Sequence, residues 1–340
     1  MPPTALAALL NGRARKVTPA AVRALRDALP GSTILVSEDL EQARRHVREL
    51  IEQRPDVVLS GGGDGAAVGL LNLWREGGGR ELPTIGLLRL GTGNGWARGA
   101  GAPEFFSHVR RLARLNGEML PVQEVTLVEV VDRLCPFAGV GWDARILNDY
   151  QRNLGRRAAQ PVGSRLASWL HKGVHGYLYS LARITIPEEW MRLRREGQAT
   201  VALENLGPEV FGVDGEEIVP LPGAKQLHQG PISVGAASSV REWGYGIRAF
   251  PRAGLKPGFI NVRIYGGHVL DALLNARRIW RGLAVAGVHE WLATGVRMRF
   301  SRPMPLQVGG DPMGERSEIV LRAARERVRV VDWRAAFGAR

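Results

Sequence analysis

Two glycine-rich turns, each between an apolar run and a segment of helical character, constrain the fold of this chain more than any other feature. The first unit reads VVLSGGGDGAAVGLLNLW from residue 57, and the second reads TIGLLRLGTGNGWAR and ends at Arg98. Each apolar run predicts a buried strand, and the residues after each turn predict a helix. Glycine lets a backbone approach a bound group closely, and a helix N-terminus offers unpaired N–H groups to an anion. The pair of turns therefore predicts a site for one polyphosphate at neighbouring strand ends.

Each turn taken alone is explained equally well as a tight strand-to-helix connection. The first turn, however, also carries Asp64, an acid that a purely structural turn does not need. No Gly-Lys-Ser/Thr sequence follows, so a P-loop is not expected. GTGNG is a weak match to a dinucleotide fingerprint and lacks a clear ribose-binding acid at the expected distance. An NAD-dependent oxidoreductase remains an alternative that leaves Asp64 unexplained.

The chain before these turns repeats the strand–helix alternation. Residues 5–10 and 32–36 predict strands, whereas residues 18–29 and 40–51 predict helices, the first opened by a capping Thr18 followed by proline. Alternation of this kind implies a parallel sheet covered by helices on both faces.

The pattern changes near residue 122. Short strands separated by Gly and Pro dominate from Ala199 onward, and they predict a mainly antiparallel β-sandwich. We therefore expect an α/β domain with a parallel sheet over residues 1–122 and a β-rich domain over residues 123–325. Residues 326–340 form a tail whose return to the first domain is left open.

The charge and composition of the chain limit the kinds of binding partner that we expect. The 340 residues carry a formal net charge of +13, which favours anionic membranes or phosphates; a solvated basic surface explains it equally well. No compact basic run or zinc spacing supports specific nucleic-acid recognition. Cys135 is the only cysteine, and we expect a core residue in a cytoplasmic protein. No apolar run is long enough to span a bilayer and no signal peptide is evident, so any membrane contact is expected to be peripheral. A homodimer is left open.

SGGGDG followed by LGTGNGWAR resembles the diacylglycerol kinase catalytic family, which includes sphingosine, ceramide and bacterial lipid kinases; NAD kinases share a more distant GGDG loop. The resemblance implies a diacylglycerol kinase-like fold and transfer of the γ-phosphate from ATP, with Mg²⁺, to a lipid hydroxyl such as that of diacylglycerol, ceramide or a sphingoid base. It also assigns the lipid substrate to the β-rich domain over residues 123–325. The nucleotide-binding positions that it implies, or that the turns supply, are Asn11, Ser37, Gly62, Gly63, Asp64, Gly65, Gly91, Thr92, Gly93 and Asn94.

Several of these residues have competing roles. Asp64 is the first candidate for catalysis, either orienting Mg²⁺ or accepting the hydroxyl proton. Ser37 and Asn94 are alternatively explained as helix caps. In PLQVGGDPMG, Gly309 stands where the family has an aspartate and Asp311 where it has a glutamate. Asp311 is thus the candidate general base, with a surface turn as the alternative.

The sequence also departs from the family pattern. Ala66, Gly69 and Gly95 replace polar or acidic residues, and Lys256 and Pro257 stand where bacterial members carry acids for a structural metal. We therefore predict that the structural metal site is lost. A catalytically weak or inactive nucleotide- or lipid-binding relative is the alternative to an active lipid kinase, and an NAD kinase fits less well.

Three further segments have a composition that suits a functional role. FAGVGWD ends in Asp143, which is either functional or a turn residue, and residues 148–182 predict a helix with a broad apolar face. Residues 270–292 predict a helical insertion with Trp280 and Trp291 near Arg277, Arg278 and Arg281. That composition suits a membrane interface, although an amphipathic helix packed on the sandwich is the favoured interpretation.

Overall fold

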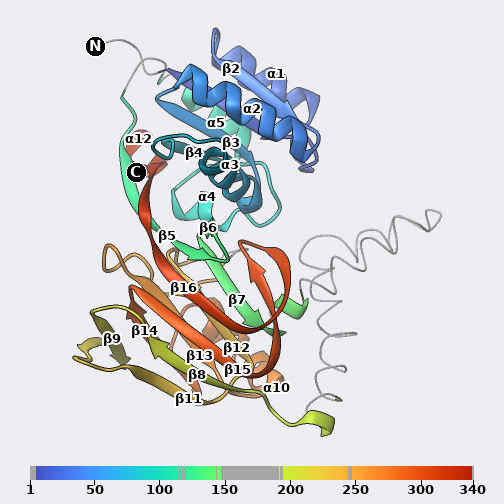
Figure 1. Cartoon of the computed structure of the whole chain (residues 1–340). Helices are drawn as coiled ribbons and strands as arrows, with labels where there is room; N and C mark the ends of the chain where they lie inside the picture. Colours follow the sequence, from blue (N-terminus) through green and yellow to red (C-terminus); the bar gives the residue numbers. More distant parts are fainter. Residues whose placement is uncertain are drawn as a thin grey trace, which may run out of the picture. The chain divides into compact units, whose positions relative to one another are not determined.

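The computed structural model describes residues 5–113, 115, 119–142, 144–146, 191, 194–243 and 247–338. The chain divides into two compact units (Figure 1). Unit 1 comprises residues 1–127, 240–246 and 324–340, and unit 2 comprises residues 128–239 and 247–323. The predicted fold class, an N-terminal α/β domain with parallel strands followed by an antiparallel strand-rich domain, is confirmed.

Unit 1 is built on four parallel strands in the spatial order β4-β3-β1-β2 (Figure 1). Buried aliphatic side chains fill β1 and β3, as expected for strands covered on both faces. The strands are β1 (Leu6–Asn11), β2 (Thr33–Ser37), β3 (Val57–Gly62) and β4 (Ile85–Arg89). The helices are α1 (Pro19–Ala28), α2 (Leu40–Gln53), α3 (Asp64–Glu76), α4 (Gly95–Gly99), α5 (Phe105–Leu112) and α12 (Trp333–Ala336).

Short polar residues fix where the first two helices begin. Thr18 Oγ1 accepts a hydrogen bond from the Ala21 amide at 3.2 Å, with Pro19 at the first helical position, as predicted. Asp39 Oδ1 accepts from the Gln42 amide at 2.8 Å and caps α2. The alternative role of Ser37 as a helix cap is therefore wrong, because Asp39 performs it.

The C-terminal segment of the chain packs within unit 1. Val330 pairs in parallel with Ile85 of β4. The Trp333 indole is fully buried and donates to the Leu87 carbonyl at 3.1 Å. Its ring packs edge-on against His108 of α5, with the ring centroids 4.2 Å apart. These contacts extend the core of unit 1 beyond the four strands.

Unit 2 is dominated by antiparallel pairs, which run in the order β10-β9-β14-β13-β12-β7-β15. β15 also pairs with β8, and β8 with β11. The strands are β6 (Arg133–Cys135), β7 (Phe137–Gly141), β8 (Thr200–Asn205), β9 (Val210–Asp214), β10 (Glu217–Pro220), β11 (Gln226–Pro231), β12 (Val234–Ser238), β13 (Ile260–Tyr265), β14 (Val288–Ala293) and β15 (Gly295–Val308). β5 (Val122–Val130) and β16 (Asp311–Val331) contribute residues to both units. Cys135 is fully buried, which confirms its prediction as a core residue.

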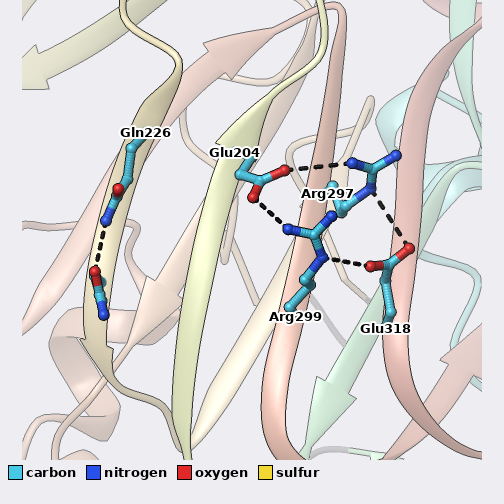
Figure 2. Close-up of polar contacts among 6 residues, drawn as sticks. Glu204, Gln226, Arg297, Arg299 and Glu318 are labelled. Carbon is cyan, nitrogen blue, oxygen red and sulfur yellow. Dashed lines mark hydrogen bonds and ion pairs between the residues drawn. The ribbon is translucent and has the colours of Figure 1, made fainter.

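A charged network crosses three strands on one face of unit 2 (Figure 2). Glu204 on β8 pairs with Arg299 of β15 at 2.6 Å and with Arg297 at 3.4 Å. Glu318 on β16 pairs with the same two arginines at 2.7 and 3.4 Å. The side chains of Arg299 and Glu318 are about half exposed, so this ring of alternating charges holds the strands in register without closing off the face from water.

One prediction of secondary structure was wrong. The expected helical insertion over residues 270–292 is two short helices, α10 (Val269–Leu274) and α11 (Ala276–Trp280), followed by β14. Gly282 and Gly287 both have positive φ and lie between α11 and β14, where they interrupt the helical conformation. Trp291 is buried on β14.

The strands expected toward the end of the chain are joined into the single long β16, and Trp333 begins α12. Asp143 and the predicted helix over residues 148–182 lie outside the described residues.

Candidate functional site

The carboxyl ends of the parallel strands of unit 1 gather the predicted nucleotide-binding residues at one edge of the sheet. Asn11 at the end of β1 is level with Ser37 at the end of β2, and Leu10 is level with Gly61 of β3. The Gly12 amide donates to the Ser37 carbonyl at 2.9 Å. A Cβ atom built on Gly62 would lie 3.4 Å from Cβ of Asn11, so the first turn begins directly beside the end of β1.

The two glycine turns touch each other through their backbones. A Cβ atom at Gly91 would overlap Cα and the amide nitrogen of Gly63. A Cβ atom at Gly63 would lie 3.6 Å from Cα of Gly91. Only glycine therefore fits at position 91. This contact brings two sets of turn amides together at neighbouring strand ends, where the pair of glycine-rich motifs predicted them.

Asp64 ties the two turns together through hydrogen bonds. Its Oδ2 accepts from the Gly95 amide at 2.8 Å, and its Oδ1 accepts from the Trp96 amide at 3.1 Å. These are the first two amides of α4, so Asp64, itself at the start of α3, caps the other helix. Burial raises the pKa of the Asp64 carboxyl, whereas the amide donors and the nearby Arg98 lower it.

Asn94 closes the second turn. It has a left-handed backbone (φ 49°, ψ 38°) and is buried. Its Oδ1 accepts from the Gly91 amide at 2.9 Å, and its Nδ2 donates to the Gly91 carbonyl at 2.7 Å. The alternative role of Asn94 as a side-chain cap is therefore wrong, because Asp64 caps α4. Thr92 is exposed at the tip of this turn.

A pocket of about 260 Å³ opens beside the first turn. Its lining includes Asn11, Arg13, Ser37, Glu38 and Gly65. The Ser37 hydroxyl is buried and, among the described residues, has no hydrogen-bond partner. Such an unsatisfied group is costly unless a ligand or water completes it. A Cβ atom at Gly65 would meet nothing within 4 Å, so the pocket continues past the start of α3.

Arg98 and Glu242 were not among the predicted site residues. Arg98 lies on α4, and its Nε is 3.4 Å from Oε2 of Glu242. Its Nη2 is buried and lacks a described hydrogen-bond partner. The motif LGTGNGWAR contained the signal for Arg98, since an arginine one turn into a helix that follows a phosphate-type turn can reach an anion. No local signal marked residues 240–246 as part of unit 1.

Asp311 belongs to unit 2, whereas the other predicted site residues belong to unit 1. It begins β16 after a hairpin turn in which Gly309 and Gly310 both have positive φ, and it pairs with Val308. The residue is exposed. Partial desolvation by neighbouring atoms raises the pKa of its carboxyl, and Arg133 opposes the shift.

The loop predicted to have lost a structural metal is held by other contacts. The Lys256 ammonium lies 3.6 Å from the centroid of the Phe211 ring and 4.6 Å from that of Phe259. It also lies 3.6 Å from Oε2 of Glu209. Within the described residues, no group of three or more His, Cys, Asp or Glu side chains is arranged to hold a metal ion.

Comparison with known families agrees with this geometry. Residues 9–126, which contain both glycine turns, match the diacylglycerol kinase catalytic domain family. The predicted resemblance to this lipid kinase family is thereby confirmed.

Individual relatives extend the similarity along the chain. A probable lipid kinase YegS of Salmonella newport is 26% identical over 268 residues, covering 77% of this chain and 74% of the relative. A probable lipid kinase YegS-like protein of Citrobacter koseri is 24% identical over 265 residues, with the same coverage. Among solved structures, a putative diacylglycerol kinase from Bacillus anthracis has a TM-score of 0.60 and 12% identity, with 98% of each chain covered. The match to this structure shows a similar fold.

None of the helices within the described residues is both long enough and apolar enough to cross a membrane.

Proposed function

We propose that this chain is an ATP-dependent lipid kinase that transfers the γ-phosphate to the hydroxyl of a lipid alcohol. The contact between Gly63 and Gly91 carries the proposal, because it joins two strand-end turns into one surface suited to a polyphosphate. The pocket beside Gly65 supports it: the buried Ser37 hydroxyl there has no described partner and suits the polar edge of a nucleoside. The family match over residues 9–126 supports the same reaction class.

The site residues of unit 1 have distinct roles in this proposal. Thr92 and the first amides of α3 bind phosphate oxygens. Asn94 and Asp64 fix the shape of the second turn, which carries Thr92. Arg98 balances the charge of Asp64 and offers its unpartnered Nη2 to a phosphate oxygen. Mg²⁺ would neutralise charge on the phosphates when bound. The Asp64 carboxylate, which the amides of α4 hold in place, would orient a water bound to this ion.

Asp311 is the proposed general base. The two Asp64 oxygens already accept backbone amides, so protonation there would weaken the bonds that hold α4. Asp311 is exposed, so its carboxylate is open to an acceptor hydroxyl, and this makes it the better proton acceptor; its pKa is raised, as is that of Asp64. In the transfer step the acceptor hydroxyl gives its proton to this carboxylate, its oxygen bonds to the γ-phosphorus, and the bond to the β-phosphate oxygen breaks to release ADP.

The test is transfer of label from γ-labelled ATP, with Mg²⁺, to diacylglycerol, ceramide and sphingoid bases in mixed micelles. Wild type should give one labelled lipid class, Asp64→Asn and Asp311→Asn should lower the yield by at least about a hundredfold, and the exposed control Asp27→Asn should match wild type. No labelled lipid, despite stabilisation by ATP in a thermal shift, would support the inactive-relative alternative. Stabilisation by NAD(H) instead would support an oxidoreductase.

We further propose that the protein works in the cytoplasm and binds membranes peripherally. The excess of basic residues supports this proposal, because an anionic membrane surface attracts positive charge.

A further inference from the structure

We propose that residues 274–283 of unit 2 form a surface that docks on an anionic lipid bilayer. This docking surface consists of Leu274, Arg277, Trp280, Arg281 and Leu283. The inference deepens the proposed function, since it rests on the acceptor being a membrane lipid. It replaces the favoured sequence-based interpretation, in which this segment packs its apolar side against the sheet.

The apolar side chains of the docking surface are exposed. Leu274 is 85% exposed, Leu283 48% and Trp280 46%. α11 buries none of its residues. A single exposed leucine needs no explanation, but three large apolar side chains within ten residues of sequence remain in contact with water here. Such a cluster gains free energy only when another apolar phase covers it.

The charges beside these side chains identify the partner. Arg277, Arg278 and Arg281 are all exposed, and Asp271 is the single acid between residues 269 and 284, which gives 3 − 1 = +2 for the segment. In the part of the chain that the structure describes, neither Arg277 nor Arg281 forms an ion pair. Arginine beside tryptophan and leucine matches the boundary between lipid headgroups and acyl chains.

A nucleic acid fits this surface less well than a bilayer. Phosphates and bases would satisfy the arginines and stack on Trp280. They would leave the aliphatic side chains of Leu274 and Leu283 in water. A bilayer accommodates both kinds of group at once, because acyl chains cover the leucines while anionic headgroups pair with the arginines.

Hydrogen bonds to backbone carbonyls hold the docking surface in place before any partner binds. The Arg248 amide donates to the Trp280 carbonyl at 3.0 Å. The Arg278 guanidinium Nε donates to the Ala284 carbonyl at 3.0 Å and closes the turn after α11. Asn275 Nδ2 donates to the Asp271 carbonyl at 2.8 Å and links the two short helices. Binding therefore does not require this segment to fold, which lowers the entropic cost of docking.

The experiment is sedimentation of the full chain with phosphatidylcholine vesicles, either pure or containing 30% phosphatidylserine. Leu274→Ser/Trp280→Ser should reduce binding to the anionic vesicles at least tenfold. Arg277→Gln/Arg281→Gln should reduce it about 25-fold, at roughly fivefold for each basic residue near the surface. The control Arg23→Gln/Arg48→Gln removes the same charge from exposed positions on α1 and α2 and should change binding less than twofold.

The outcomes separate this proposal from the proposed kinase activity. Equal binding by all variants, or no binding to anionic vesicles, would overturn the docking surface. Phosphorylation of a water-soluble short-chain acceptor by the same variants reports on the kinase alone. Variants that lose vesicle binding but keep this turnover support docking within an active enzyme. Loss of vesicle binding by the docking variants, in a chain that phosphorylates no acceptor, supports docking while contradicting the kinase.

Discussion

The two acids predicted for catalysis, Asp64 in unit 1 and Asp311 in unit 2, occupy opposite kinds of environment. The carboxylate oxygens of Asp64 accept hydrogen bonds from the Gly95 and Trp96 amides, and the residue links two glycine turns whose backbones touch. Asp311 is exposed at a two-glycine hairpin, with Arg133 as the charge that most affects it. The difference suggests a division of labour. A residue that holds a phosphate site in shape is fixed by the backbone, whereas one that exchanges a proton is left open to its substrate.

The largest effect is expected from a substitution that forces the two glycine turns of unit 1 apart. Gly91→Ala places a methyl group into the backbone of Gly63, and we expect a loss of about 3 kcal/mol in the free energy of unfolding. Urea denaturation measures it. Gly65→Ala is the matched control, because its methyl group would meet nothing within 4 Å and should leave stability unchanged or raise it by about 1 kcal/mol. Equal effects of the two substitutions would show that the turns do not touch.

The pH dependence of unit 1 gives the next largest effect. Burial, with Arg111 contributing, lowers the pKa of His108 to about 3 from 6.5. Between these two pH values the unfolded chain binds a proton at His108 that the folded chain does not bind. The contribution of neutral His108 to the free energy of unfolding is therefore complete above pH 6.5 and declines as pH falls toward 3. The expected loss is about 2 kcal/mol by pH 5.

Denaturation curves between pH 5 and 8 test this prediction. His108→Phe should flatten the pH dependence, whereas His46→Gln, a change at a partly exposed histidine on α2, should leave it as in wild type. A wild-type slope that survives in His108→Phe would assign the effect to another group. Because His108 packs against Trp333 and Phe337, the C-terminal segment should loosen first at low pH.

A comparison of the two acids in stability assays sharpens their assigned roles. Asp64→Asn should lower the unfolding free energy by about 1–2 kcal/mol, because an amide cannot accept from both Gly95 and Trp96. Asp311→Asn should leave stability unchanged. Its effect should appear in turnover, and wild-type activity should fall as acidification protonates this carboxyl, whose pKa is raised. A stability loss for Asp311→Asn as large as that for Asp64→Asn would contradict the division.

The smallest expected effect concerns the loop in unit 2 that carries Lys256. Lys256→Met removes the ammonium that interacts with Phe211, Phe259 and Glu209 and should cost about 0.5–1 kcal/mol. Treatment with EDTA should leave the melting temperature of the ATP-free protein unchanged. A drop in melting temperature that Mg²⁺ restores would reveal a structural metal after all.

Local pattern was enough to predict much of unit 1. Strand–helix alternation placed Asn11, Ser37 and both turns at one sheet edge, since parallel strands end on the same side. The hydrogen bonds of Asp64 to α4 span 31 and 32 residues and depend on the packing of two units of sequence. The periodicity of the sequence does not indicate hydrogen bonds between residues so far apart. The same is true of Glu242, which reaches Arg98 across 144 residues.

Unit 2 was harder to predict because short apolar runs do not distinguish a strand from a helix. The residues around Trp291 fit a helical face in sequence, but pairing of β14 with β13 and β9 decides their conformation. The exposure of Trp280 was likewise invisible, since the sequence shows which side chains are apolar and not whether anything covers them.

The central claim is that the two touching turns of unit 1 hold a polyphosphate. The most direct test is an NMR titration of glycine-selectively ¹⁵N-labelled protein with ATP and Mg²⁺, after the turn glycines have been assigned by single substitutions. We expect the amide signals of Gly63, Gly65 and Gly93 to shift together with a single affinity, while the signals of unit 2 glycines such as Gly215 and Gly223 do not move. Saturable shifts confined to unit 2, or none in either turn at saturating ATP, would contradict it.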